Sequence, residues 1–170
     1  MDLFPIFLKL AARPCVVVGA GNLAESKIES LQAAHAKVTV IAPKANRRIV
    51  DLAEAGDVEW LQREYAAGDL TGNFLVVAAT DVPAVNRAVF AEATEKNILC
   101  NAVDDPPFCD FYFPSVVRRG DLQIAISTAG ASPALAQQLR STLEGSAKPP
   151  RDPTRKRPGA ARGKSSRPMR

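Results

Sequence analysis

The sequence predicts an α/β fold in which a parallel sheet carries helices on both faces. Three observations support this. Short β-rich runs alternate with longer helical patterns through residues 1–103, several of the β-rich runs are continuously apolar, and a glycine-rich turn follows the first of them. Continuous apolar character is typical of strands buried on both faces. Strand–helix alternation with right-handed crossovers places the carboxyl ends of the strands along one edge.

The elements of this first region follow one another in order. Strands are expected at 15–18, 37–42, 58–61, 74–79 and 98–103. Helices are expected at about 22–34, at 45–55 and from Thr80 or Asp81 to about Glu95. Thr80 or Asp81 is expected to cap the last of these helices, because Pro83 suits a first helical turn.

A smaller extension follows at 104–145. Two strands, 111–117 and 122–127, flank Arg118-Arg119-Gly120-Asp121 and predict a β-hairpin. Ser132-Pro133 then opens a helix to about Glu144, since serine suits the N-cap and proline the first helical position. The predicted domains are thus 1–103, which carries the parallel sheet, the hairpin and helix extension at 104–145, and a tail at 146–170.

The tail differs from the rest of the chain in charge and composition. Residues 146–170 hold nine Lys or Arg and one acid, which is +8, whereas residues 1–145 sum to −4. With five of the 13 prolines and almost no apolar side chains, the tail is expected to be disordered. A basic tail can contact nucleic acid, anionic lipid or an acidic protein, but a solvated extension is the favoured interpretation, so nucleic acid is not an expected partner.

Composition excludes several classes of protein. Apolar residues make up 46% and charged residues 24% of the 170-residue chain, as in ordinary globular proteins. No apolar run reaches the ~18 residues that span a membrane, and the amino terminus has no basic segment typical of a secretory signal. The three cysteines, Cys15, Cys100 and Cys109, form no C-x-x-C pair, which argues against a disulfide framework or structural zinc. A cytoplasmic protein with no membrane partner is expected.

The glycine-rich turn is the most specific motif. Gly19-Ala20-Gly21-Asn22-Leu23-Ala24 fits the pattern G-x-G-x-x-G/A, and it follows a strand and opens a helix. Gly19 permits the tight turn, Gly21 lets a pyrophosphate approach the backbone, and Ala24 is small enough for close helix–strand packing. The helix N-terminus offers free N–H groups to the phosphates. The motif therefore predicts a Rossmann-like dinucleotide site rather than a glycine turn without a ligand.

The end of the second strand lacks the acidic residue that dinucleotide sites usually carry there. An acid there normally binds the ribose hydroxyls, but this sequence reads Ala42-Pro43-Lys44. Backbone groups can bind the ribose instead. Lys44, Arg47 and Arg48 can also accept a 2′-phosphate, although a solvated helix start is favoured for the two arginines. On this chemistry NAD and NADP both remain open.

Asp104 lies at the predicted edge of the sheet, directly after the fifth strand and before Asp105. Adjacent carboxylates can act as a general base or bind a cation, and a capped turn before the following prolines has equal weight. Cys100, Cys109 and Asp110 match no strong metal signature, so no metal site is assigned.

Six further groups of residues occur together in the order of one known family. They are Phe4-Pro5-Ile6-Phe7, residues 17–24 with Lys27, residues 78–81 with Asn86, residues 100–104, Phe113-Pro114-Ser115 and residues 127–136. Over about 1–144 the chain therefore resembles the siroheme synthase amino-terminal module, the precorrin-2 dehydrogenase/sirohydrochlorin ferrochelatase family.

The resemblance implies NAD-dependent oxidation of precorrin-2 to sirohydrochlorin, and in some members insertion of Fe(II) as a substrate to give siroheme. It implies that Asp104 is the catalytic acid/base. It also implies that NAD lies against the glycine motif, with contacts from Asn22, Leu23, Pro43, Lys44, Thr80 and Asp81. The alternative from another class is a regulatory domain that binds NAD without chemistry, and such a domain would not need Asp104.

The resemblance also bears on the extension at 104–145. Family members continue with a longer helical segment that builds a homodimer and closes the site, whereas here Gly145 leads into the basic tail. The resemblance implies a homodimer, although the segment that builds it is shorter here, and the same shortening bears on iron insertion. Thr128 stands where some members carry a regulatory phosphoserine. Arg118 and Arg119 can bind substrate carboxylates, with a solvated turn as the favoured alternative.

Overall fold

The structure is a computed structural model that describes residues 3–145. The predicted disordered tail, 146–170, lies outside the described residues. The chain divides into two units, Met1–Phe113 and Pro114–Arg170. The functional boundary predicted at 103/104 falls within the first of these units and stays a prediction.

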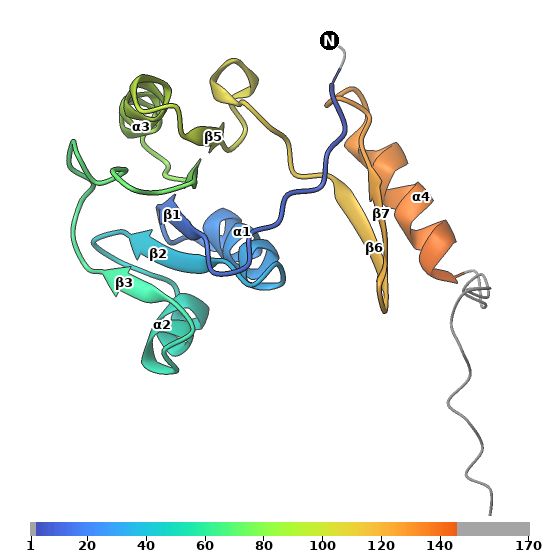
Figure 1. Ribbon diagram of the computed structural model, residues 1–170, viewed down its shortest axis with the longest axis horizontal. Helices are drawn as coiled ribbons and strands as arrows, with labels where there is room; N and C mark the ends of the chain where they lie inside the picture. The colour runs from blue at the N-terminus through green and yellow to red at the C-terminus, as the bar shows by residue number, and fades with distance from the viewer. Residues whose placement is uncertain (1–2, 146–170) are drawn as a thin grey trace, which may run out of the picture. The chain divides into compact units, whose positions relative to one another are not determined.

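The first unit is a five-stranded parallel sheet with the order β3-β2-β1-β4-β5 (Figure 1). Its elements are β1 (Pro14–Val18), α1 (Asn22–Gln32), β2 (Lys37–Ile41), α2 (Arg47–Glu54), β3 (Glu59–Leu61), β4 (Leu75–Ala78), α3 (Pro83–Glu95), β5 (Leu99–Ala102) and a short 3₁₀ helix at Pro106–Phe108. The predicted α/β class and Rossmann-like sheet are confirmed.

The apolar runs become central strands because both faces of the sheet are covered. Successive side chains of a strand point to opposite faces. On β1, Val17 packs into a core with Ile28 of α1 and Ile49 of α2, while Val16 packs into a second core with Val89 of α3. Helices therefore lie on both faces, as the sequence predicts.

The predicted cap of α3 is wrong. The N-cap is Val82, which makes no side-chain cap, and the helix begins at Pro83. The Thr80 hydroxyl instead donates to Oδ1 of Asn86, 2.7 Å away, within the second turn of the helix. Thr80 and Asp81 therefore belong to the loop after β4 rather than to the helix start.

The second unit is an antiparallel hairpin followed by a helix. Its elements are β6 (Ser115–Arg119), β7 (Leu122–Ile126) and α4 (Pro133–Gly145). Gly120, at φ +57°, occupies the turn, and Ser132 caps α4 by accepting a hydrogen bond from the Leu135 N–H at 3.3 Å. Arg119 donates to the Leu143 and Glu144 carbonyls, where a cation suits the helix C-terminus.

The first hairpin strand begins later than the sequence predicts, at Ser115 rather than at 111. Residues 109–111 pair with β5 instead. The Asp110 N–H donates to the Cys100 carbonyl at 2.8 Å, and the Phe111 carbonyl accepts from Asn101 Nδ2 at 2.7 Å. Phe111, which the sequence assigns to the hairpin, is thus bound to β5, directly after the bridge between Cys109 and Asn101 that extends the edge of the sheet.

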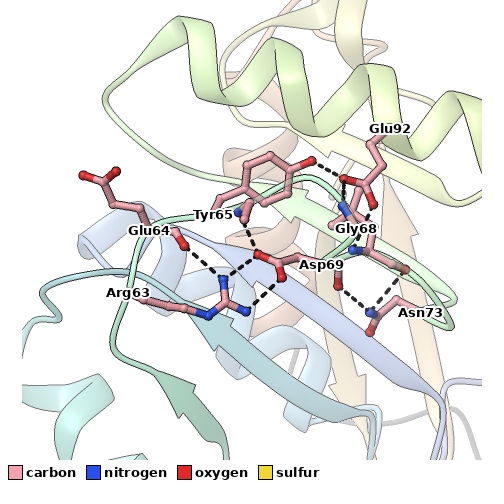
Figure 2. Close-up of polar contacts among 9 residues, drawn as sticks. Arg63, Glu64, Tyr65, Gly68, Asp69, Asn73 and Glu92 are labelled. Carbon is pink, nitrogen blue, oxygen red and sulfur yellow. Dashed lines mark hydrogen bonds and ion pairs between the residues drawn. The ribbon is translucent and has the colours of Figure 1, made fainter.

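A buried polar network anchors the long connection between β3 and β4 to α3 (Figure 2). Glu92 is only 8% exposed, and its carboxylate accepts hydrogen bonds from the Tyr65 hydroxyl and from the Gly68 and Leu70 N–H groups. Burial alone would raise the pKa of Glu92, but the three hydrogen bonds outweigh it and the pKa lies below its ordinary value. Asp69 is held similarly by two hydrogen bonds from Arg63, at 2.7 and 2.8 Å.

Among residues 3–145, no helix is long and apolar enough to cross a bilayer.

Candidate functional site

Four loops lie side by side where the strands of the parallel sheet end. Backbone hydrogen bonds just beyond the strands join them in the order of the sheet: Ala42 N to Leu61 O at 3.2 Å, Gly19 N to Ile41 O at 2.9 Å, Ala79 N to Val18 O at 2.8 Å, and Val103 N to Ala78 O at 2.9 Å. The loops after β1, β2, β4 and β5 therefore form one continuous edge, which we call the carboxyl edge. The strand order reverses between β1 and β4, the place where open α/β sheets bind ligands.

The two glycines of the motif serve different purposes. Gly19 has φ +107°, and a Cβ at this position would lie 2.4 Å from the Ala79 carbonyl oxygen, so no larger residue fits there. Gly21 is the N-cap of α1 and has extended backbone; a Cβ there would meet nothing within 4 Å. α1 carries no side-chain cap, so the open space before Gly21 faces an uncapped helix N-terminus. That is an anion site of the kind that binds a pyrophosphate.

The loop after β2 is joined to the glycine turn through Asn46. The Asn46 N–H donates to the Ala20 carbonyl at 3.0 Å, and its Nδ2 donates to Glu25 Oε2 at 2.6 Å. Pro43 and Lys44 lie exposed in this loop. Sequence patterns do not single out Asn46 or Glu25, because these two partners lie 21 residues apart along the chain.

Asn86 shapes the loop after β4. This buried side chain donates from Nδ2 to the Thr80 carbonyl at 3.0 Å, and its Oδ1 accepts from the Thr80 N–H at 3.2 Å. Asp81 is exposed at the tip of the loop. In the sequence, Asn86 stands out only as part of the family resemblance. The structure shows that it positions the loop of Thr80 and Asp81.

Asp104 stands exposed after β5 with φ +61°, a left-handed conformation that few residues other than glycine adopt. The turn is fixed on both sides, because the Asp105 N–H donates to the Ala102 carbonyl at 3.1 Å and the Cys109 thiol donates to the same carbonyl at 3.0 Å. The backbone therefore presents the Asp104 carboxylate on the carboxyl edge, and the strain of this conformation fits a functional position.

Lys27 of α1 is a second charged group near Asp104. Its Nζ lies 4.5 Å from the centre of the Phe113 ring, within cation–π range. Partial burial lowers the pKa of Lys27, and the charge of Asp104 opposes that shift. The signal in the sequence is its spacing, since Lys27 falls on the same helical stripe as the buried Ala24, Ile28 and Leu31.

The thiols at this end of the sheet are structural. Burial, with the charge of Asp110 adding to it, raises the pKa of Cys100 to about 12, and burial likewise raises the pKa of Cys109. Asp110 accepts the Cys100 N–H at 2.9 Å. Within the described part of the chain, no three His, Cys, Asp or Glu side chains are grouped as metal ligands would be.

The structure brings the nine site residues predicted from the sequence onto the carboxyl edge: Gly19, Gly21, Asn22 and Leu23 after β1, Pro43 and Lys44 after β2, Thr80 and Asp81 after β4, and Asp104 after β5. Arg118, Arg119 and Thr128 belong to the second unit, where Thr128 Oγ1 accepts the Ser132 N–H at 3.1 Å. The open space before Gly21 and the uncapped helix N-terminus fit a dinucleotide. The fold and this edge define a dinucleotide-binding α/β protein.

Comparison with known families agrees with this class. Residues 6–115 match the family described as putative NAD(P)-binding, and residues 119–146 match the family described as sirohaem biosynthesis protein central. Among solved structures, "SirC, precorrin-2 dehydrogenase" has a TM-score of 0.74 and 29% identity, covering 84% of this chain and 70% of that one.

Curated relatives carry the name siroheme synthase. The chain is 44% identical over 144 residues to the siroheme synthase of Actinobacillus pleuropneumoniae serotype 3 (strain JL03), and 46% identical over 144 residues to that of Methylococcus capsulatus (strain ATCC 33009 / NCIMB 11132 / Bath). In each case 85% of this chain is covered but only 30% of the relative's length. The chain belongs to the siroheme synthase amino-terminal module family, and NAD is the cofactor that this membership supports.

Proposed function

We propose that this chain catalyses the NAD-dependent oxidation of precorrin-2 to sirohydrochlorin. The observation that carries the proposal is the placement of Asp104, whose carboxylate shares the carboxyl edge with the glycine turn. The likeness to a precorrin-2 dehydrogenase structure at 29% identity and to siroheme synthases at 44% identity supports the same reaction.

The reaction removes a hydride and a proton from the macrocycle. When bound, NAD accepts the hydride. The N-terminal N–H groups of α1, beginning at Asn22 and Leu23, would hold the pyrophosphate, and Pro43, Lys44, Thr80 and Asp81 would border the rest of the dinucleotide. Asp104 accepts the proton at its carboxylate, and Lys27 lies near enough for the Asp104 charge to act on it.

The experiment is an anaerobic incubation of the purified chain with precorrin-2, with and without NAD. The proposal expects sirohydrochlorin and NADH to form together and only when NAD is present, read from their separate absorbance bands. A folded chain that binds NAD but produces no NADH would instead support the alternative, an NAD-sensing regulatory domain, and would contradict the dehydrogenase.

Insertion of Fe(II) into sirohydrochlorin is a second step that we propose for the same carboxylate. Metal insertion releases two protons from pyrrole N–H groups, and the exposed Asp104 carboxylate can accept them one after the other, passing each to solvent. Adding Fe(II) to the product of the first assay tests this step. We expect a spectral shift faster than in an enzyme-free control, and equal rates would contradict the chelatase.

A homodimer is the assembly that we propose, through α4 of the second unit. Leu135, Leu139 and Leu143 follow one another at intervals of four residues and are 46%, 43% and 36% exposed. Such a stripe on one helix face is typical of a packing surface. Light scattering should give the mass of a dimer for the unaltered chain and of a monomer for Leu139→Glu, and a monomeric unaltered chain would contradict the assembly.

We also propose that the chain acts in the reducing cytoplasm, which the free thiols of Cys15, Cys100 and Cys109 support.

A further inference from the structure

We propose that Glu25, held in place by Asn46, is the residue that selects NAD over NADP. In dinucleotide-binding folds this selection usually depends on an acid at the end of the second strand. That position here reads Ala42-Pro43-Lys44 and holds no acid. The inference rests on the proposed use of NAD and assigns the missing function to a different element, the first turn of α1.

Asn46 connects the two elements between which the adenosine ribose is expected. It follows the loop after β2, and its Nδ2 donates to Glu25 Oε2 at 2.6 Å and to Asn22 Oδ1 at 3.4 Å. Glu25 and Asn22 both lie in the first turn of α1, next to the glycine turn. A carboxylate of α1 is therefore brought to the loop after β2, where the usual acid would stand.

The side chain of Asn46 has one orientation that satisfies all of its partners. Its Oδ1 accepts the Ile49 N–H at 3.0 Å and so caps α2, while its Nδ2 faces Glu25. Exchanging the two ends of the amide would place an N–H against the Ile49 N–H and an oxygen against the carboxylate. The backbone is also fixed, because the Asn46 N–H donates to the Ala20 carbonyl at 3.0 Å. Asn46 is thus a rigid support for Glu25.

Glu25 has the chemistry that ribose recognition requires. Glu25 is the acidic residue in the first turn of α1, where a negative charge is favourable. Among residues 3–145, the hydrogen bonds to Glu25 engage Oε2, which leaves Oε1 as an acceptor for a ribose hydroxyl. The same charge repels the additional phosphate of NADP, and this repulsion is the basis of the proposed selectivity.

The nearby arginines are directed away from a phosphate-binding role. Arg47 forms an ion pair with Asp51 at 2.8 Å, and Arg48 lies 3.8 Å from Glu29 of α1. Both pairs are exposed and weak, but each arginine already has an acid beside it. The two arginines that follow Asn46 are therefore each beside an acid already, while Glu25 is the carboxylate that Asn46 itself holds.

The test is a titration of NAD and NADP into the unaltered chain and into Glu25→Gln by calorimetry, without precorrin-2. The unaltered chain should bind NAD at least about tenfold more tightly than NADP, a factor that corresponds to ~1.4 kcal/mol. In Glu25→Gln the difference should fall to about threefold or less, mainly because NADP binds more tightly. Glu54→Gln, which removes the same charge from the far end of α2, is the matched control and should keep the original ratio.

The outcomes separate this inference from the function on which it rests. An unchanged ratio of the two affinities in Glu25→Gln, with an unchanged melting temperature, would overturn the inference and leave the dehydrogenase intact. If the unaltered chain binds neither dinucleotide, the proposed function is overturned with it. Raising the salt concentration should narrow the ratio in the unaltered chain and not in Glu25→Gln, because salt screens the repulsion of the 2′-phosphate.

Discussion

The Glu92 network and the carboxyl edge both contain acidic side chains, but these side chains differ in burial and in their hydrogen-bond partners. Glu92 is buried, and both of its carboxylate oxygens accept hydrogen bonds from the connection between β3 and β4 (Figure 2). Asp104 is exposed on a strained turn, and the N-terminus of α1 has no side-chain cap. An acid whose partners are all supplied by its own fold stabilises that fold, whereas an edge with uncommitted polar groups is suited to a ligand.

The comparison also separates residues of the same type. Gly19 belongs to the fold, because its backbone conformation and the closeness of Ala79 exclude any side chain. Gly21 is assigned to the proposed site, because nothing in the described part of the chain lies within 4 Å of where its Cβ would be. Substituting each glycine and Glu92 tests this division.

The largest effect is expected for Gly19→Ala. Its Cβ would lie 2.4 Å from a backbone oxygen in a left-handed conformation, so the strand–helix turn must move. We expect a loss of more than about 3 kcal/mol in the free energy of unfolding, or failure to fold. Chemical denaturation measures the loss, and a stability within about 1 kcal/mol of the unaltered chain would contradict a fold role for Gly19.

Gly21→Ala makes the same substitution as Gly19→Ala but at the glycine assigned to NAD binding. Its Cβ enters open space from an extended backbone, so the melting temperature without NAD should change little. The added methyl group occupies the approach of the pyrophosphate, and NAD should bind at least about tenfold more weakly. Calorimetric titration measures this, and NAD affinity equal to that of the unaltered chain would place the dinucleotide elsewhere.

Glu92→Gln tests whether the Glu92 network stabilises the fold, and its expected effect is smaller than that of Gly19→Ala. The amide keeps one acceptor oxygen and loses the other, so one of the donors from Tyr65, Gly68 or Leu70 is left without a partner. We expect a loss of about 1–3 kcal/mol in the free energy of unfolding and no change in NAD affinity. A selective loss of NAD affinity would show that the network belongs to the site after all.

The smallest effect concerns pH. The pKa of Glu92 is lowered in the folded chain, so its stabilisation is complete above its ordinary pKa of 4.5 and is lost as the pH falls through the lower, folded value. The stability difference between the unaltered chain and Glu92→Gln should therefore be constant above about pH 5.5 and shrink below 4.5. Denaturation curves across this range measure it, and a difference that grows toward acid would mean that the folded pKa is raised.

Local patterns predicted the parts of the molecule that depend on neighbours in sequence. The apolar runs around Val16 and Val76 and the turn at Gly19 define the sheet and the position of the carboxyl edge. Thr80 was assigned to the wrong element, because its hydroxyl bonds to Asn86 rather than capping α3 at its start. The first hairpin strand begins at Ser115 rather than at 111 for a related reason, because Phe111 is bound by Asn101 of β5.

The contacts that the sequence did not reveal join residues far apart in the chain. Asn46 and Glu25 are separated by 21 residues, and Tyr65 and Glu92 by 27. Neither pair has a characteristic spacing in the sequence, because the two residues of each pair come together only when the sheet has formed. Lys27 is recognisable in the sequence as a charged residue on the apolar stripe of α1.

The central claim is that Asp104 performs proton transfer on an edge whose other residues bind NAD. The most direct measurement is NADH formation from precorrin-2 by Asp104→Asn, with NAD affinity determined on the same preparation. The account predicts that NAD binds with unchanged affinity while the rate of NADH formation falls by about 10²-fold or more. An unchanged rate would contradict the role of Asp104, and loss of NAD binding together with activity would place this carboxylate in the cofactor site instead.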